Sequence, residues 1–124
     1  MNANELMIGD WVRHANGTPM QVEKIDYRGF ACGIPHCWDY NNIYEPIPIT
    51  KELLDKNGFA LDDGMYTNDV MTLHDDKKFI RTKNAWSVGA FENECCRIAH
   101  CELTYLHELQ HLLRICKIDF EWKV

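Results

Sequence analysis

The sequence lacks a long apolar stretch and the features of a leader peptide. No run approaches the roughly 20 consecutive apolar residues that a transmembrane helix needs. The first residues contain no Lys or Arg and are interrupted by Gly9 and Asp10, so they have neither the charged start nor the apolar middle of a signal peptide. We therefore expect a cytoplasmic protein with no membrane partner.

Basic clusters are also missing. The chain has 13 Lys and Arg against 19 Asp and Glu, a formal charge of -6, and its only basic run is the pair Lys77-Lys78. Because phosphate backbones reward clustered Lys and Arg, nucleic acid is not expected as a direct partner. The sequence shows no Gly-rich phosphate loop and no Ser-His-Asp order. The four tryptophans are too scattered for a stacking motif, so core packing is expected for each.

What is present is the composition of one ordinary globular domain. The chain has 124 residues, of which 46% are hydrophobic and 26% charged, which excludes disorder of the whole chain. A chain of this size can bury a core without disulfide or metal staples. In a reducing compartment its six cysteines are expected to be free thiols or metal ligands.

The first half of the chain is predicted to form short strands. Turn residues and alternating apolar positions place them at 6–14, 19–25, 27–34 and 43–49. Phe30, Cys32 and Ile34 are expected to share one face of the third strand. Pro46 and Pro48 cannot donate ladder hydrogen bonds, so the fourth should be an edge strand. The pattern predicts a small bent antiparallel sheet, an SH3-like partial barrel.

The second half is predicted to mix helices and strands. Thr50 can cap a short helix over 51–57, and Gly58 suits the left-handed residue just past its end. A strand meander follows, and Thr104 is expected to cap a C-terminal helix that reaches about residue 116, before an extended tail. The meander strands are predicted at 70–73, 79–81, 85–91 and 95–103. The fold class is therefore α+β, in a single domain 1–124 with a bent-sheet half (1–49) and an α+β half (50–124).

The C-terminal helix contains the sequence His107-Glu108-Leu109-Gln110-His111, which matches the H-E-x-x-H motif of the zincin metallopeptidases. Two histidines four residues apart share a helix face and can hold one zinc ion, and Glu108 would then be the catalytic base. A catalytic zinc needs a third protein ligand. The carboxylates after His111 are Asp119 and Glu121, both in the predicted tail.

The faces of this helix argue against a zinc site. At about 100° per residue, Leu106, Leu109 and Leu113 define the buried face, and both histidines lie opposite to it. We therefore expect the pair to face solvent unless another part of the chain covers it. A zinc-dependent hydrolase is kept as one alternative hypothesis.

Two further segments share the spacing C-x₃-H-C. They begin at Cys32 and at Cys96. In extended strands Cys32 would align with His36, and Cys96 with His100, which together offer two sulfurs and two nitrogens for a tetrahedral zinc ion. Neither segment has a C-x₂-C knuckle, and buried free cysteine is common in cores. A structural zinc protein is a second alternative, and core thiols are the simpler interpretation.

Three segments resemble a group of small uncharacterised proteins of anaerobic gut bacteria and their phages or mobile elements. Glu5–Val12 resembles the opening E-L-x-I-G-[ND]-x-V, Ile49–Phe59 resembles the central I-x-L-[ST]-x-E-x-L-x-x-x-G-F, and Leu106–Leu112 resembles the C-terminal V-H-x-L-Q-N-L. In that pattern the position of Glu108 is often Gln and that of His111 often Asn, which cannot run zincin chemistry. The resemblance implies a structural or interaction helix and no assigned activity.

These observations favour a non-enzymatic protein-interaction module. The sequence contains no convergent catalytic set, its charge is acidic, and its first half has the strand-turn-strand pattern of a small barrel. The expected partner is another protein or a second copy of the chain. No cofactor is expected, and zinc enters only through the two alternatives.

Overall fold

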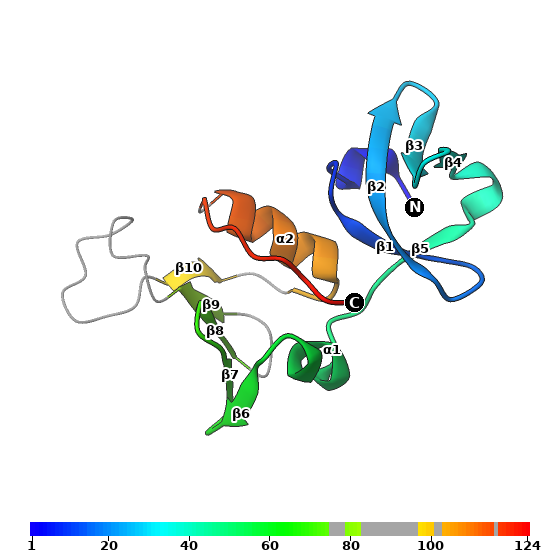
Figure 1. Cartoon of the computed structure of the whole chain (residues 1–124). Helices are drawn as coiled ribbons and strands as arrows, with labels where there is room; N and C mark the ends of the chain where they lie inside the picture. Colours follow the sequence, from blue (N-terminus) through cyan, green and yellow to red (C-terminus); the bar gives the residue numbers. More distant parts are fainter. Residues whose placement is uncertain (75–78, 83–96, 101–102, 116) are drawn as a thin grey trace. The chain divides into compact units, whose positions relative to one another are not determined.

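The computed structural model describes residues 1–74, 79–82, 97–100, 103–115 and 117–124 (Figure 1). It confirms an α+β fold, with two antiparallel five-stranded sheets and two α-helices in the described part of the chain. The predicted strand at 85–91 lies outside these residues. The chain divides into two compact units: unit 1 is Met1–Pro48 with Tyr105–His111, and unit 2 is Ile49–Thr104 with Leu112–Val124.

The sheet of unit 1 is a curled partial barrel with the strand order β4-β3-β2-β1-β5. A register shift between Val22 and Lys24, where β2 pairs with β3, is the kind of irregularity that increases strand bending. The position of β5 at the edge of the sheet confirms the prediction from its prolines. The elements are η1 (Ala3–Glu5), β1 (Trp11–His14), β2 (Pro19–Asp26), β3 (Gly29–Cys32), β4 (Cys37–Trp38), η2 (Tyr40–Asn42) and β5 (Tyr44–Pro46).

One face of this sheet forms the core of unit 1. Val12 and Val22 are fully buried, and each contributes about 1.5–3 kcal/mol of hydrophobic stabilisation by leaving water. The cluster consists of Leu6, Val12, Val22, Phe30, Cys32 and Tyr44. Leu6 joins it from the segment before β1, which fixes the N-terminal residues against the sheet.

The third strand is shorter than predicted. It ends at Cys32, and residues 33–36 form the turn to β4. Gly33 has a φ of 75°, a left-handed conformation that glycine adopts without steric cost. Ile34 is 87% exposed, so the expectation that it shares the buried face with Phe30 and Cys32 is wrong.

The short helix of unit 2 has the predicted N-terminal cap and the predicted glycine after its C-terminus. Helix α1 (Lys51–Lys56) starts after Thr50, whose side-chain oxygen accepts a hydrogen bond from the Leu53 N–H at 3.2 Å. Gly58 follows the helix with a φ of 80°, as expected for the residue that ends it.

The second sheet is an antiparallel meander with the order β10-β9-β8-β7-β6. Asp63 and Gly64 form the turn between its first two strands, and both have positive φ. The strands are β6 (Ala60–Asp62), β7 (Met65–Thr67), β8 (Met71–His74), β9 (Phe79–Thr82) and β10 (Arg97–His100). The predicted meander is thus present, with an additional hairpin, β6–β7, at its start.

The C-terminal tail is extended and anchored within unit 2. The Asn57 side-chain amide donates to the carbonyl oxygens of Leu53 and Lys123, both at 2.8 Å, and its oxygen accepts from the Lys123 N–H at 2.7 Å. The Trp122 ring stacks on Phe59 with ring centroids 6.1 Å apart. The Asn57 side chain therefore forms hydrogen bonds with both backbone groups of Lys123, as a neighbouring β-strand would.

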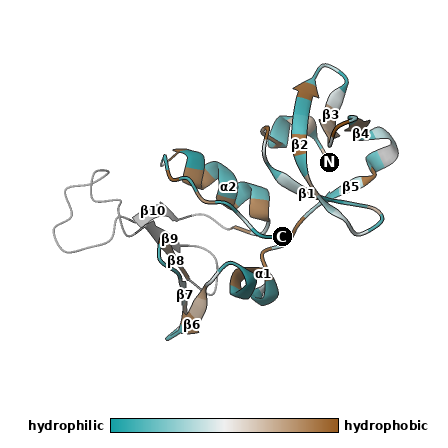
Figure 2. Cartoon of the chain, in the orientation of Figure 1, coloured by the Kyte–Doolittle hydropathy of each residue, from teal (hydrophilic) through white to brown (hydrophobic). Residues whose placement is uncertain are grey.

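Helix α2 (Leu106–Ile115) contributes its first residues to unit 1 and its last residues to unit 2. Hydrophobic and hydrophilic residues are interspersed along it (Figure 2). Leu106, Leu109 and Leu113 are buried, which confirms the predicted apolar face. Within the described ranges, no helix has both the length and the apolar character needed to cross a bilayer.

Candidate functional site

Two side chains of α2 form hydrogen bonds with the segment that precedes β1. The Gln110 side chain accepts a hydrogen bond from the Trp11 N–H at 2.9 Å and donates to the Gly9 carbonyl oxygen at 3.2 Å. His111 Nε2 lies 2.5 Å from Oδ2 of Asp10, whose carboxylate is fully buried and also accepts from the Met7 N–H at 2.7 Å. Two segments about 100 residues apart therefore meet in unit 1.

The helix position of His107 predicted an exposed side chain unless another part of the chain covered it. His107 is covered, and only 5% of it is exposed. Its ring stacks on Tyr105 with centroids 5.9 Å apart and meets the ring of His111 edge to face at 5.7 Å. Burial lowers the pKa of His107, although the negative charges of Asp10, Glu108 and Glu5 act in the opposite direction. The imidazole is therefore neutral near pH 7, and its buried Nδ1 has no hydrogen-bond partner among the described residues.

Glu108 has a structural role at the beginning of α2. Its Oε1 accepts a hydrogen bond from the Tyr105 N–H at 2.7 Å. Because the helix begins at Leu106, Tyr105 is the residue before the first turn and Glu108 is the third residue of the helix, the positions joined in half of a capping box. The predicted cap, Thr104, lies one residue too early.

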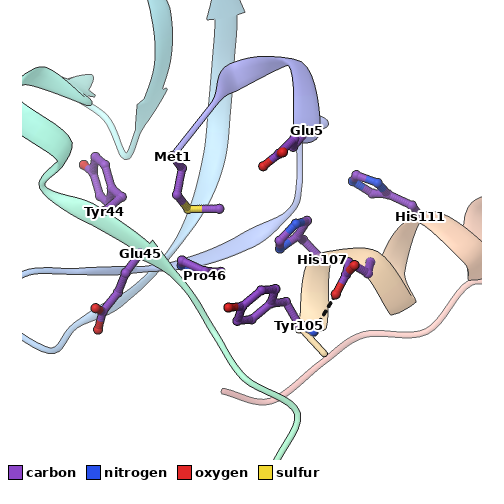
Figure 3. A pocket seen from close by; sticks show the side chains of 9 residues that line it. Met1, Glu5, Tyr44, Glu45, Pro46, Tyr105, His107 and His111 are labelled. Atoms are coloured by element: carbon purple, nitrogen blue, oxygen red, sulfur yellow. Dashed lines mark hydrogen bonds between the residues drawn. The ribbon is translucent and has the colours of Figure 1, made fainter. Parts of the chain in front are cut away.

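A pocket of about 680 Å³ opens in unit 1 beside these residues (Figure 3). Its lining comes from the first residues of the chain and β5, and from Tyr105 and the first half of α2. Its lining consists of Met1, Glu5, Tyr44, Glu45, Pro46, Tyr105, His107, Glu108 and His111. In Figure 3 the ring of His107 projects from the helix toward Met1 and Glu5.

The zincin motif residues meet in this pocket, but as parts of other arrangements. Glu108 caps the helix, and the carboxylate beside His111 is the upstream Asp10. In the part of the chain that the structure describes, no three His, Cys, Asp or Glu side chains are grouped so as to hold a metal ion. No zinc-dependent step can therefore be derived from the geometry of this pocket.

The two cysteine-histidine segments have a different geometry from the one expected. Cys32 is buried at the end of β3, and His36 is exposed in the following turn, so the expected alignment on one extended strand is wrong. Burial raises the pKa of the Cys32 thiol to about 11, which disfavours the thiolate that zinc requires. Cys96 and the side chain of His100 lie outside the described residues, so the four-ligand site stays a prediction.

A second feature lies on the surface of unit 1, around the turn between β2 and β3. We call the side chains of Lys24, Tyr27, Arg28, Trp38 and Tyr40 the aromatic patch. The Arg28 guanidinium lies 4.3 Å from the centre of the Trp38 ring and 5.6 Å from that of Tyr27, and Lys24 Nζ lies 5.9 Å from Trp38. These distances are typical of cation–π contacts.

The aromatic patch is exposed and partly pre-ordered. Tyr27 is 95% exposed and Tyr40 60%, whereas Trp38 is half-buried. Arg28 also forms a salt bridge with Asp26 at 2.8 Å, and its hydrogen bonds hold the pKa of that carboxyl below its ordinary value. Core packing was predicted for all four tryptophans. Trp122 confirms that prediction, and Trp38 does not.

Sequence reasoning missed the residues that complete the pocket. Asp119 and Glu121 follow His111 in the sequence, whereas the carboxylates that lie near the two histidines are Glu5, in the pocket lining, and Asp10, beside His111, both about 100 residues earlier. The available signal was the Ile8-Gly9-Asp10 sequence within a segment that resembles a known opening motif. This resemblance singled out the segment before β1, but it did not indicate that the segment contacts α2.

Comparison of the chain with protein-family models, with curated proteins and with solved structures finds no match in any of the three.

Proposed function

We propose that this protein is a non-enzymatic protein-interaction module that binds an acidic segment of a partner protein through the aromatic patch. The observation that supports the proposal most directly is the placement of Arg28 over Trp38 and beside the exposed ring of Tyr27. Trp, Tyr and Arg are the residues that dominate the energetics of protein–protein interfaces. Large exposed aromatic rings next to one another are uncommon on a surface that contacts only water.

The charge distribution of unit 1 supports an acidic partner. Unit 1 has three Lys and Arg residues against seven Asp and Glu, a net charge of -4. Two of the three basic side chains, Lys24 and Arg28, lie over the ring of Trp38. Two of the three basic side chains of unit 1 therefore lie in the aromatic patch, where together they exceed the one negative charge of Asp26, the partner of Arg28, and can attract a further carboxylate.

Arg28 is suited to receive such a carboxylate. It forms hydrogen bonds to Asp26 through Nε and Nη2 only, and no described residue accepts a hydrogen bond from Nη1. A guanidinium has five N–H donors, so a partner carboxylate can be bound while the salt bridge to Asp26 remains. The salt bridge and the ring contacts restrict the side chain before binding, which lowers the entropic cost of association.

The proposal can be tested by selecting peptides from a random-sequence phage-display library on the immobilised protein. We expect the selected peptides to be enriched in Asp and Glu. Their affinity should fall by about tenfold or more in Tyr27→Ala and Arg28→Ala, the loss typical of an interface hot spot. Leu61→Ala is the matched control, because Leu61 is 49% exposed but lies in unit 2.

Several results would overturn the proposal. One is the absence of enriched peptides, and another is peptides that bind Tyr27→Ala and Leu61→Ala equally well. Saturable binding of a 15-nucleotide oligo-dT that is lost in Arg28→Ala would assign the aromatic patch to single-stranded nucleic acid. A concentration-dependent dimer that Tyr27→Ala dissociates would assign it to self-association. Thermal unfolding of each variant shows whether the fold is kept.

A further inference from the structure

The pocket beside α2 has a charge and a hydrogen-bonding pattern of its own, separate from the aromatic patch. We propose that it is a binding site for an organic cation, a primary ammonium or guanidinium group, held by Glu5 and by the imidazole of His107. The cation belongs either to a small amine or to a Lys or Arg side chain of a peptide. A pocket of about 680 Å³ has the size of small-molecule sites in proteins.

The lining is acidic. Three of its nine residues are Glu5, Glu45 and Glu108, and none is Lys or Arg; the α-ammonium of Met1, another of the nine, is paired with Asp39 at 3.5 Å. Glu108 is engaged by the Tyr105 N–H, whereas no described residue pairs with the carboxylate of Glu5. The buried Asp10 adds negative charge behind His111. These charges favour a ligand with positive charge and disfavour carboxylates and phosphates.

His107 is the second and independent reason for expecting a ligand. A buried polar atom without a partner costs free energy, and such groups in native structures call for an explanation. The His107 side chain is 5% exposed, lines the pocket and has an unpartnered Nδ1. Because the ring is neutral, the tautomer protonated at Nε2 has an acceptor at Nδ1 for an ammonium or guanidinium N–H. Because this atom is buried, a side chain that lines the pocket must move before a ligand N–H can reach it.

The aromatic walls suit the same ligand. Tyr105 and His107 stack with an interplanar angle of 8°, and Tyr44 lines the pocket as well (Figure 3). Ring faces attract ammonium and guanidinium groups and also pack against their carbon chains. A metal ion would instead require several close ligands, and the described residues provide no such group.

The test uses the full chain and four probes. Pentylamine represents a free amine, and N-acetyl-lysine and N-acetyl-arginine methylamides represent peptide side chains. Pentanol is the uncharged control of the same length. Binding is followed through the imidazole resonances of His107 and His111 by NMR. We expect saturable shifts with at least one cationic probe and none with pentanol, and the preferred probe identifies the source of the cation.

Variants then separate the two parts of the site. Glu5→Gln should weaken binding by about three- to fivefold, the range of an exposed ion pair. His107→Phe, which keeps a ring, should weaken it by about tenfold or more through loss of the acceptor. Glu23→Gln is the matched control, because Glu23 is exposed, lies on β2 and changes the net charge equally.

The proposal is overturned if none of the cationic probes shifts the histidine resonances at 10 mM, or if pentanol binds as tightly as pentylamine. It also fails if Glu5→Gln and Glu23→Gln behave alike. His107→Phe must keep the unfolding transition of the wild-type protein to be informative, and Glu5→Gln, at an exposed position, provides the test if it does not.

Discussion

The contact between Gln110 and the segment before β1 leads to a quantitative prediction. Gln110→Ala removes the acceptor of the Trp11 N–H and one of two donors to the Gly9 carbonyl oxygen. The other donor, Gln21 Nε2 at 3.1 Å, remains, so only the N–H loses its sole described partner. A partly buried N–H without a partner costs about 1–2 kcal/mol, and the weakened carbonyl interaction adds about 0.5 kcal/mol. We therefore expect a loss of about 2 kcal/mol.

Urea unfolding followed by circular dichroism gives the free energy of unfolding, and amide exchange at Trp11 reports on the contact directly. Gln21→Ala is the matched control, since the same type of side chain contacts the same carbonyl from an exposed position; it should change stability by less than about 0.5 kcal/mol. Gln110→Met keeps the volume and should cost nearly as much as Gln110→Ala. Equal stability of Gln110→Ala and Gln21→Ala, or unchanged protection of the Trp11 amide, would refute the reasoning.

Three other outcomes follow from buried groups. Because burial lowers the pKa of His107 below its ordinary 6.5, the unfolded chain binds a proton more readily, so the free energy of unfolding should fall as the pH is lowered from above 6.5, and His107→Phe should flatten this part of the profile. Asn57→Ala should cost about 2 kcal/mol by releasing Lys123, and a C-terminal protease should then trim the tail faster. Iodoacetamide at pH 8 should label the exposed Cys37 and spare Cys32 until the protein unfolds, as mass spectrometry of the peptides would show.

Local features were predictable from the sequence because their causes are local. The Thr50 cap, the left-handed Gly58 and the edge position of β5 each depend on one or two neighbouring residues. At Ile34 the prediction was wrong because the alternation of apolar residues was extended to about residue 34, into the Gly33-Ile34-Pro35 break, whereas the strand ends at Cys32. Apolar periodicity predicts that a segment forms a strand, but it does not predict the residue at which the strand ends.

The pocket was not predictable for a different reason. A helical wheel gives the relative directions of His107 and His111, but it contains no information about which other segment covers them. The covering segment includes Asp10 and lies 101 residues before His111. No local pattern specifies a contact over that separation.

The division of α2 between the two units has a consequence for protein synthesis. Unit 1 receives Tyr105–His111 only after the whole of residues 49–104 has been made, so the Asp10 carboxylate and the Trp11 N–H lack these partners until Gln110 and His111 have been synthesised. Domains usually fold in order from the N-terminus as they emerge. Here the first-made sheet is completed by late-made residues, so a truncated product would present an unfinished unit 1 to cellular proteases.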